Sequence, residues 1–337
     1  MESVPTKRAL ITGISGPDGA YLARFLLGNG YDVVGASRDA QAASFTNLAK
    51  LGIRDRVKTI SMSLTDFRSV LQALSQTKPD EIYNLAAQSS VGLSFEQPVE
   101  TMESIGVGTL NLLEAIRFIG VPTKLYNAGS SECFGDTAGQ AADETTAFRP
   151  RSPYAVAKAA AFWEVANYRE AYKIFACSGI LFNHESPLRP DRFVTKKIVN
   201  AAFRIADGTG ERLSLGNLDI QRDWGWAPEY VEAMWLMLQR KRPEDFVIAS
   251  GETNTLRDFV ASVFSNFGLD WQEHVDFDPG LMRPSELLVS MADPSKAARE
   301  LGWRAQYRMR DVTRKLAEKS VQQISLETNL QAADKLR

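Results

Sequence analysis

The sequence contains only two cysteines and two histidines, and this scarcity excludes several kinds of site. Cys133 and Cys177 cannot build a disulfide framework, and neither belongs to a C-x-x-C pair, so we expect both to be buried free thiols. His184 and His274 lie far apart in the chain and lack the spacing of metal ligands. We therefore expect no metal site, and we interpret His184 as a structural histidine.

The sequence also lacks an excess of positive charge and long apolar segments. A formal net charge of -2 and an isoelectric point near 5.9 argue against a surface for nucleic acids or anionic membranes. The first apolar run, residues 9–14, is too short for a signal peptide, and no run reaches the length of a membrane span. We therefore expect a cytoplasmic protein with neither a nucleic-acid partner nor a membrane partner.

What the sequence does contain is an alternation of strand-like and helix-like segments. Helical patterns such as residues 67–76 and 109–118 separate these segments. Strand-like runs are expected at residues 7–12, 32–36, 57–60, 81–86, 124–127 and 174–181. This alternation predicts an α/β fold, a Rossmann-type doubly wound parallel sheet with right-handed crossovers.

The pattern changes after about residue 182, where aromatic residues, proline and arginine become more frequent. Helical patterns are expected at residues 194–206, 230–239, 256–266 and 294–301. The strand-like run 246–250 is expected to rejoin the main sheet. We therefore predict a cofactor-binding domain over residues 1–182, with a returning segment near 220–251. A smaller, interleaved C-terminal substrate lobe consists mainly of residues 183–337.

A glycine-rich turn, with Gly13, Gly16 and Gly19, follows the first strand-like run and opens a helix. Glycines permit a tight bend and a close approach of the backbone to a pyrophosphate, and the helix N-terminus offers free amides. At the end of the second strand, where NAD binders carry an acidic residue, stands Arg38, which can pair with a 2′-phosphate. The sequence favours a site for NADP over NAD; a plain glycine-rich turn and a surface arginine are the alternatives.

Tyr154 and Lys158 stand four residues apart at the start of a predicted helix, which Ser152 caps and Pro153 opens. Residues with this spacing share one helix face. A cation beside Tyr154 should favour the phenolate and lower a pKa that starts near ~10, so that the tyrosine can take a proton from a sugar hydroxyl. Alone, the pair also fits an ordinary helix surface, so its meaning depends on the rest of the chain.

With these motifs, the first half of the chain resembles the extended short-chain dehydrogenase/reductase family. Longer segments resemble the GDP-mannose 4,6-dehydratases more narrowly, namely residues 11–23, 83–89, 182–187, 216–225 and 230–235. The resemblance extends from about residue 7 to 310. It implies a lyase that uses NADP to dehydrate GDP-mannose to GDP-4-keto-6-deoxymannose by internal hydride transfer.

The resemblance also implies a catalytic set of Ser130, Glu132, Tyr154 and Lys158. In the implied reaction, Tyr154 removes the C4 hydroxyl proton while hydride leaves C4, and the resulting ketone acidifies the C5 hydrogen. Glu132 takes that proton, Ser130 or Glu132 helps to protonate the water that departs from C6, and hydride returns to C6. Without the resemblance, Ser130 and Ser131 fit the role of turn formers.

Two binding sets follow from the same resemblance. The implied cofactor residues are Gly13, Gly16, Asp18, Gly19, Arg38, Leu64, Leu85, Ala86, Ala87, Tyr154 and Lys158. The implied nucleotide-sugar residues are Ser89, Asn183, Lys197, Leu215, Gly216, Arg222, Arg283 and Glu286. The arginines suit a diphosphate, and Glu286 can accept hydrogen bonds from ribose or base. Alternatively, Asp223 pairs with Arg222 inside the lobe, and Trp224, Trp226 and Trp235 belong to the core.

The sequence departs from the family pattern at three places. Residues 39–44 lack the second arginine and the serine pair that the family uses to reach a neighbouring subunit's cofactor. Ser63 stands where the family has an acidic residue near the adenine, and Pro190 stands where it has a glycine. The family implies a homodimer, through helices near residues 99–118 and 153–172, or a tetramer. The departures leave open a dehydratase, 4-reductase or epimerase for a related GDP-sugar such as a GDP-manno-heptose. A non-catalytic NADP-binding regulator is a third interpretation.

Overall fold

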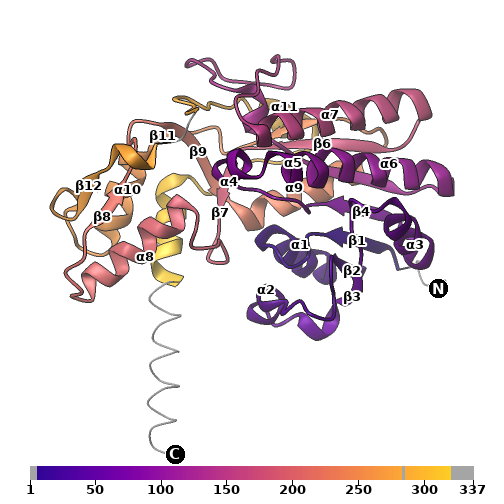
Figure 1. Cartoon of the computed structure of the whole chain (residues 1–337), viewed down its shortest axis with the longest axis horizontal. Coiled ribbons are helices and arrows are strands. Elements are labelled where there is room, and N and C mark those ends of the chain that lie inside the picture. The colour runs from indigo at the N-terminus through magenta and orange to yellow at the C-terminus, as the bar shows by residue number, and fades with distance from the viewer. Residues whose placement is uncertain (1–5, 283–284, 320–337) are drawn as a thin grey trace, which may run out of the picture.

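A seven-stranded parallel sheet forms the centre of the computed structural model, which describes residues 6–282 and 285–319 (Figure 1). The strand order is β10-β6-β5-β4-β1-β2-β3. The strands are β1 (Arg8–Thr12), β2 (Asp32–Ser37), β3 (Lys58–Ser61), β4 (Glu81–Asn84), β5 (Lys124–Ser130), β6 (Ala176–Leu181) and β10 (Phe246–Ile248). Because β1 lies between β2 and β4, the order of the strands turns at this point, where doubly wound sheets bind ligands beyond their carboxyl ends.

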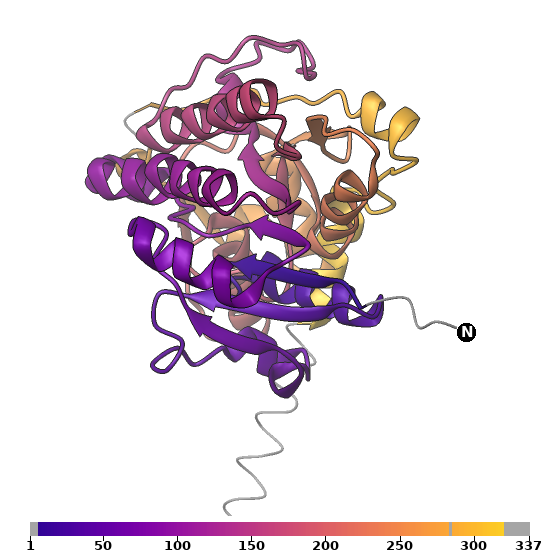
Figure 2. The same ribbon diagram turned by 90° about the vertical axis from the view of Figure 1, so that its right-hand side faces the viewer.

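Helices cover both faces of the sheet, because successive strand residues point to opposite sides. Ala9 and Ile11 pack with α1 (Pro17–Gly28) and α9 (Ala227–Gln239), and α11 (Ser295–Glu300) adds to this side. Leu10 points to the other face, which α3 (Phe67–Thr77), α6 (Gly108–Ile119) and α7 (Pro153–Tyr172) cover. Figure 2 shows these layers edge-on. Each face therefore has its own apolar core.

Short elements at the edges of the sheet complete the first domain. They are α2 (Thr46–Lys50), η1 (Arg54–Arg56), α4 (Val91–Glu96), α5 (Pro98–Met102), η2 (Glu103–Val107) and η3 (Ser131–Phe134). The π-helical turn η2 joins α5 to α6, and Met102 and Gly108 at its two ends keep right-handed helical backbone angles. The three elements therefore run on as one helix.

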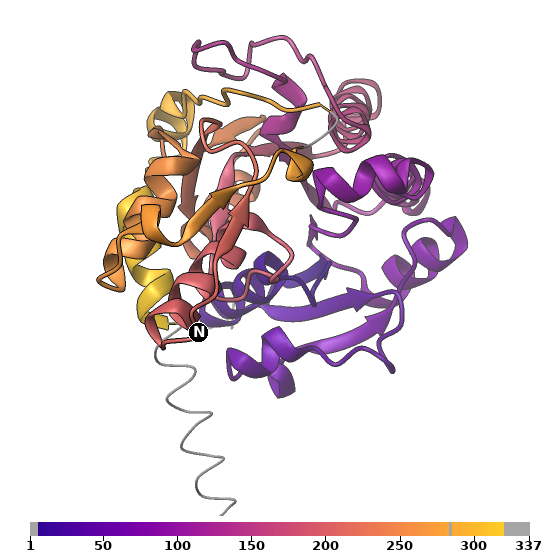
Figure 3. The same cartoon turned by 60° about the vertical axis from the view of Figure 1, so that its left-hand side comes forward.

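The smaller lobe is built on two small sheets (Figure 3). One contains β7 (Asn183–Glu185), β9 (Gln221–Trp226) and β11 (Thr253–Thr255), and the other contains β8 (Leu213–Leu215) and β12 (Val275–Phe277). The helical elements are α8 (Val194–Ala206), α10 (Leu256–Asn266), η4 (Trp271–Glu273) and η5 (Pro279–Leu281). A capping box of Thr255 and Asp258 starts α10. Apolar residues of α8, α10 and β9 then form a separate core.

The structure confirms the predicted α/β fold and most of its elements. Residues 246–248 rejoin the main sheet beside β6, and α8 and α10 have the predicted bounds. Cys133 and Cys177 are buried free thiols. Within the predicted returning segment, however, β9 belongs to the smaller lobe, and only α9 and β10 reach the main sheet. Among the helices of the described residues, none is long and apolar enough to cross a membrane.

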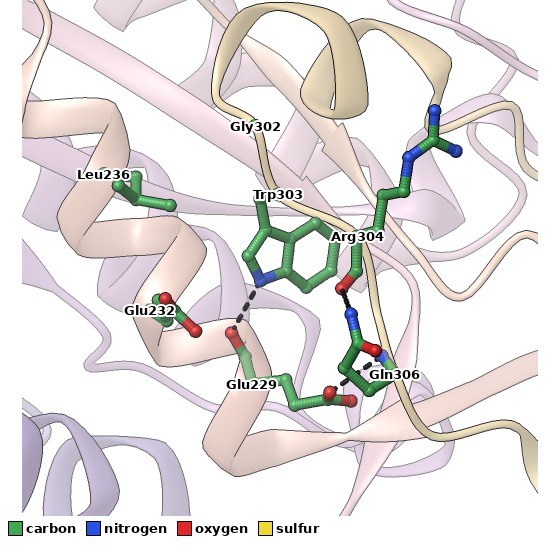
Figure 4. A pocket seen from close by; sticks show the side chains of 7 residues that line it. All are labelled: Glu229, Glu232, Leu236, Gly302, Trp303, Arg304 and Gln306. Atoms are coloured by element: carbon green, nitrogen blue, oxygen red, sulfur yellow. Dashed lines mark hydrogen bonds between the residues drawn. The ribbon is translucent and has the colours of Figure 1, made fainter.

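A cavity of about 240 Å³ lies between α9 and the segment of residues 302–306 (Figure 4). The carboxylate of Glu229 accepts the backbone amides of Gln306 (2.8 Å) and Tyr307 (3.2 Å). The indole nitrogen of Trp303 donates to the Glu229 carbonyl oxygen at 3.1 Å. These groups are used in joining the C-terminal segment to α9, so we assign the cavity to packing.

Candidate active site

The glycine turn after β1 brings two pieces of backbone into close contact. Gly13 has a φ of +69°, and a Cβ there would lie 2.7 Å from the carbonyl oxygen of Leu85. A Cβ on Gly19 would lie 2.4 Å from the Gly13 carbonyl oxygen. The hydroxyl of Thr12 accepts the amides of Leu85 and Ala86, each at 3.1 Å. Only glycine fits at positions 13 and 19, and the turn is held against the end of β4.

A cavity of about 770 Å³ opens above this turn, at the carboxyl ends of the strands. It brings together nine predicted cofactor residues: Gly13, Gly16, Asp18, Gly19, Arg38, Leu64, Leu85, Ala86 and Ala87. Ser89, predicted to bind the sugar nucleotide, lines the same cavity. Within the described part of the chain, no side chain caps the start of α1, so its first amides can face an anion. The volume, the glycine cradle and these amides fit a nicotinamide dinucleotide.

Asp18 contacts a residue that the sequence analysis treated as structural. Its Oδ2 lies 3.1 Å from Nε2 of His184, whose Nδ1 lies 2.8 Å from the Phe182 carbonyl oxygen. Burial opposes a charge on His184, but Asp18 outweighs it and raises the pKa of the ring. Burial likewise opposes the charge on Asp18, and His184 outweighs it and lowers the pKa of the carboxyl. The pair is an ion pair that joins the glycine turn to β7.

The predicted catalytic residues meet where β5 ends and α7 begins. Ser130 closes β5, and its hydroxyl accepts the Glu132 amide at 3.3 Å. Ser152 caps α7 through the Ala155 amide, at 3.1 Å. This start places Tyr154 in the first turn, where its side chain is hydrogen-bonded to Ser130 and lies within the field of Glu132. The ammonium of Lys158 donates to the Ala128 carbonyl oxygen at 2.7 Å.

The expected low pKa of Tyr154 is wrong for this structure. Tyr154 and Lys158 are only 8% and 9% exposed. Burial raises the pKa of Tyr154 well above its ordinary value, although the hydrogen bond from Ser130 lowers it, and the nearby Glu132 adds to the rise. Burial also lowers the pKa of Lys158 to about 8. The Lys158 nitrogen lies 5.9 Å from the centre of the Tyr154 ring, and burial decides the direction of both pKa shifts.

The predicted sugar-nucleotide residues lie mainly in the smaller lobe, and the structure brings some of them together. Arg222 on β9 is 4% exposed, and its Nη2 lies 3.5 Å from Oε1 of Glu286. Lys197 on α8 donates to the Ser214 carbonyl oxygen at 3.0 Å, next to Leu215. A Cβ on Gly216 would lie 3.2 Å from the Leu281 carbonyl oxygen. Asn183 pairs with Trp224 in the register of β7 and β9.

Arg283, which was predicted to bind the nucleotide sugar, lies outside the described residues. Asp223 does not pair with Arg222: its carboxylate accepts the amides of Ser250 (2.9 Å) and Gly251 (2.6 Å), and burial raises its pKa to about 6. Trp224 is buried in the core of the lobe, as the alternative interpretation expected.

Comparisons with known proteins agree with this arrangement. The family model described as GDP-mannose 4,6 dehydratase matches residues 10–316. The chain belongs to the GDP-mannose 4,6-dehydratase family. Over 312 residues it is 48% identical to GDP-mannose 4,6 dehydratase 2 of Arabidopsis thaliana, covering 90% of this chain and 83% of the relative. It is 44% identical over 331 residues to the GDP-mannose 4,6-dehydratase of Vibrio cholerae, covering 88% of this chain and 89% of the relative.

The fold extends to other enzymes of nucleotide sugars. The UDP-glucose 4-epimerase of Thermus thermophilus, solved in complex with NAD, superposes with a TM-score of 0.81 at 27% identity, covering 92% of this chain and 98% of that one. The cavity above the glycine turn fits a cofactor of the same class, a nicotinamide dinucleotide.

We expect Ser130→Ala to slow turnover at neutral pH and to move the rising limb of the pH–rate profile to higher pH. The hydrogen bond from Ser130 lowers the pKa of Tyr154, so its loss raises that pKa further and leaves less phenolate at a given pH. The measurement is kcat as a function of pH. Ser131→Ala, which leaves the contact between Ser130 and Tyr154 in place, is the control. An unchanged profile for Ser130→Ala contradicts the assignment.

Proposed function

We propose that this protein is an NADP-dependent lyase that converts GDP-mannose to GDP-4-keto-6-deoxymannose. The observation that carries the proposal is that the turn η3, which carries Glu132, packs against the start of α7, which carries Tyr154: the Cys133 thiol lies 3.7 Å from the Ala155 carbonyl oxygen. A simple epimerase needs a base for one hydroxyl, whereas an elimination also needs a group that removes a carbon-bound proton. The names of the Arabidopsis and Vibrio relatives support the same reaction.

In the proposed reaction the protein takes two protons from the sugar and returns both. Tyr154 takes the C4 hydroxyl proton, with Ser130 as its hydrogen-bond partner and Lys158 on the same helix face. Glu132 takes the C5 proton, which the C4 ketone has acidified. Ser130 or Glu132 then helps to protonate the C6 hydroxyl, which leaves as water. Tyr154 then returns its proton to C5, so that the sugar has lost one water. A dinucleotide held at the glycine turn would supply the hydride chemistry, oxidation at C4 and reduction at C6, with no net oxidation.

For the cofactor, the proposed ligands are the glycine turn at the diphosphate and Arg38 at the adenosine. Arg38 follows β2 directly and lines the cavity. The adjacent Asp39 does not cancel this preference, because its carboxylate is used within its own turn, where it accepts the amides of Gln41 (2.9 Å) and Ala42 (3.1 Å). A guanidinium at this position favours a 2′-phosphate, hence NADP.

For the substrate, we propose that Arg222, Arg283, Lys197 and Glu286 hold the GDP portion, with Asn183, Leu215, Gly216 and Ser89 around it. The ion pair of Arg222 and Glu286 supports this assignment, because a buried cation that already faces an anion is prepared for a diphosphate.

We also propose that a second copy of the chain packs against α5, η2, α6 and α7. These elements lie side by side in Figure 1. They carry exposed large apolar side chains, namely Val99, Met102, Val107, Phe118, Val156, Trp163 and Tyr172. Apolar side chains gathered over adjacent elements are typical of a protein interface.

Incubation of the protein with GDP-mannose and catalytic NADP tests the reaction directly. We expect mass spectrometry to detect a GDP-sugar product that has lost one water, with no net change in NADPH. A 4-reductase would consume NADPH in proportion to product, and an epimerase would leave the mass unchanged. The same assay with a GDP-manno-heptose tests the related substrate. Absence of water loss from GDP-mannose contradicts the proposal.

We expect Glu132→Gln to bind GDP-mannose normally but to reduce dehydration by about 10²- to 10⁴-fold, the usual contribution of a general base. The amide retains the size of the side chain but cannot take the C5 proton. Exchange of the C5 hydrogen with deuterated solvent, followed by mass spectrometry, measures this step. Asp143→Asn, on the exposed loop after residue 136, is the control. Full turnover by Glu132→Gln excludes this residue as the C5 base.

We expect Arg38→Gln to weaken NADP binding by at least about tenfold and to leave NAD binding unchanged, because only NADP carries the 2′-phosphate. Fluorescence titration with each reduced cofactor measures the two affinities. Arg24→Gln, at an arginine of α1 that does not line the cavity, is the matched control. Equal losses for both cofactors would indicate that Arg38 has no role in this selectivity.

A further inference from the structure

The chain that leaves the catalytic turn η3 crosses directly to the smaller lobe. It turns at Gly135, which has a φ of +72° and lies so close to Arg149 that a Cβ would be 2.2 Å from the Arg149 carbonyl oxygen. Only glycine can make this turn. The next residue, Asp136, lies four positions after Glu132.

The carboxylate of Asp136 bonds two separate stretches of backbone. Its Oδ1 accepts the amide of Ala138 at 2.8 Å, within its own loop. Its Oδ2 accepts the amides of Leu288 at 2.8 Å and Val289 at 3.4 Å. The carboxylate therefore joins the continuation of the catalytic turn to a segment 152 residues further along the chain.

That segment is also hydrogen-bonded to β9, the strand that carries Arg222. On its other side, the Leu288 carbonyl oxygen accepts the amide of Gln221 at 2.7 Å, and the Ser290 amide donates to the Gln221 carbonyl oxygen at 3.0 Å. Gln221 directly precedes Arg222 on β9, and Leu288 follows Glu286 by two residues. Both partners of the Arg222–Glu286 ion pair are thus connected to the backbone that Asp136 holds.

The charges at this junction also link Asp136 to Arg222. Burial tends to raise the pKa of Asp136, but the three backbone amides and the charge of Arg222 outweigh it and hold that pKa below its ordinary value. The Arg222 guanidinium therefore lies in the fields of two carboxylates, those of Glu286 and Asp136.

We propose that Asp136 is a positioning residue for the reaction: it holds Arg222, which takes the diphosphate of the nucleotide sugar, and the partner of Arg222, Glu286, in register with the turn that carries Glu132. This inference rests on the proposed function, because it assigns Arg222 and Glu286 to the substrate and Glu132 to the sugar. Asp136 acts through these residues and through backbone, without contact with the reacting carbons.

The two segments remain paired without the carboxylate, so a variant should still fold. The Thr137 amide donates to the Val289 carbonyl oxygen at 3.0 Å, and the Ala142 amide donates to the Met291 carbonyl oxygen at 2.9 Å. Loss of the Asp136 carboxylate should therefore loosen the junction without separating the lobes.

The test compares Asp136→Ala and Asp136→Asn with the wild-type protein. For Asp136→Ala we expect KM for GDP-mannose to rise about tenfold and kcat to fall by a smaller factor, with an unchanged Kd for NADP. Asp136→Asn keeps one oxygen acceptor for the Leu288 amide, so its KM should lie between that of the wild type and that of Asp136→Ala. Asp143→Ala is the matched control, because Asp143 also caps an exposed turn but bonds only to Thr145 and Thr146 of that turn.

Calorimetric titration with GDP separates this inference from the proposed function. Weaker GDP binding by Asp136→Ala than by the wild type and the Asp143 variant supports it, whether or not GDP-mannose is dehydrated. Equal GDP binding by Asp136→Ala and the wild type overturns the inference. So does a loss of NADP affinity in Asp136→Ala that is as large as its loss of GDP affinity. A wild-type protein that does not bind GDP overturns it as well. A wild-type protein that binds GDP but does not dehydrate GDP-mannose contradicts the proposed function alone.

Discussion

The exclusion of water from Tyr154 and Lys158 is the constraint on which the chemistry of this site depends. Burial penalises the phenolate and the ammonium alike, so it raises one pKa and lowers the other toward the neutral range. Each group can carry a charge in this buried place only if neighbouring groups replace the hydrogen bonds of the lost water. Ser130 is such a neighbour for the phenol, and the Ala128 carbonyl oxygen is one for the ammonium. The end of β5 supplies both, which explains why the catalytic turn and α7 must start at the same place.

This requirement shapes the path of the chain around the site. One domain carries Ser130, Glu132, Tyr154 and Lys158, the proposed catalytic residues, whereas the other carries Arg222 and Glu286. The connection between them is more than a hinge, because residues 136–142 pair with residues 288–293 along the junction. Since β10 and α9 return to the main sheet after β9, the chain crosses between the lobes more than once. Repeated crossings hold these two groups of residues at a fixed separation more firmly than a single linker could.

Local features of this protein were predictable from its sequence, and the reasons are local. Ser152 and Pro153 specify where α7 begins, and the glycines at positions 13 and 19 specify a turn that admits no side chain. Contacts between residues far apart in the chain, and burial, are what local patterns do not contain. The contact between Asp18 and His184 joins residues 166 positions apart, and Asp223 is satisfied by amides 27 and 28 positions away. Helical spacing likewise places Lys158 on the face of Tyr154 but contains no information on burial, which decides the pKa of the phenol.

Both regions that we propose to bind a diphosphate contain carboxylates, and the burial of their cations explains why. A buried cation with no ligand would be costly, since an unpaired charge loses its hydration without compensation. In the cofactor cavity, Asp18 faces His184, and Arg189 lies 3.5 Å from Glu185. In the smaller lobe, Arg222 faces Glu286. Each cationic side chain is therefore held in place by a carboxylate. In the proposed complexes, a diphosphate would add a second anion beside a side chain that is already oriented. The protein gives up some electrostatic attraction, because each carboxylate opposes the ligand, and gains a site whose geometry does not have to be assembled on binding.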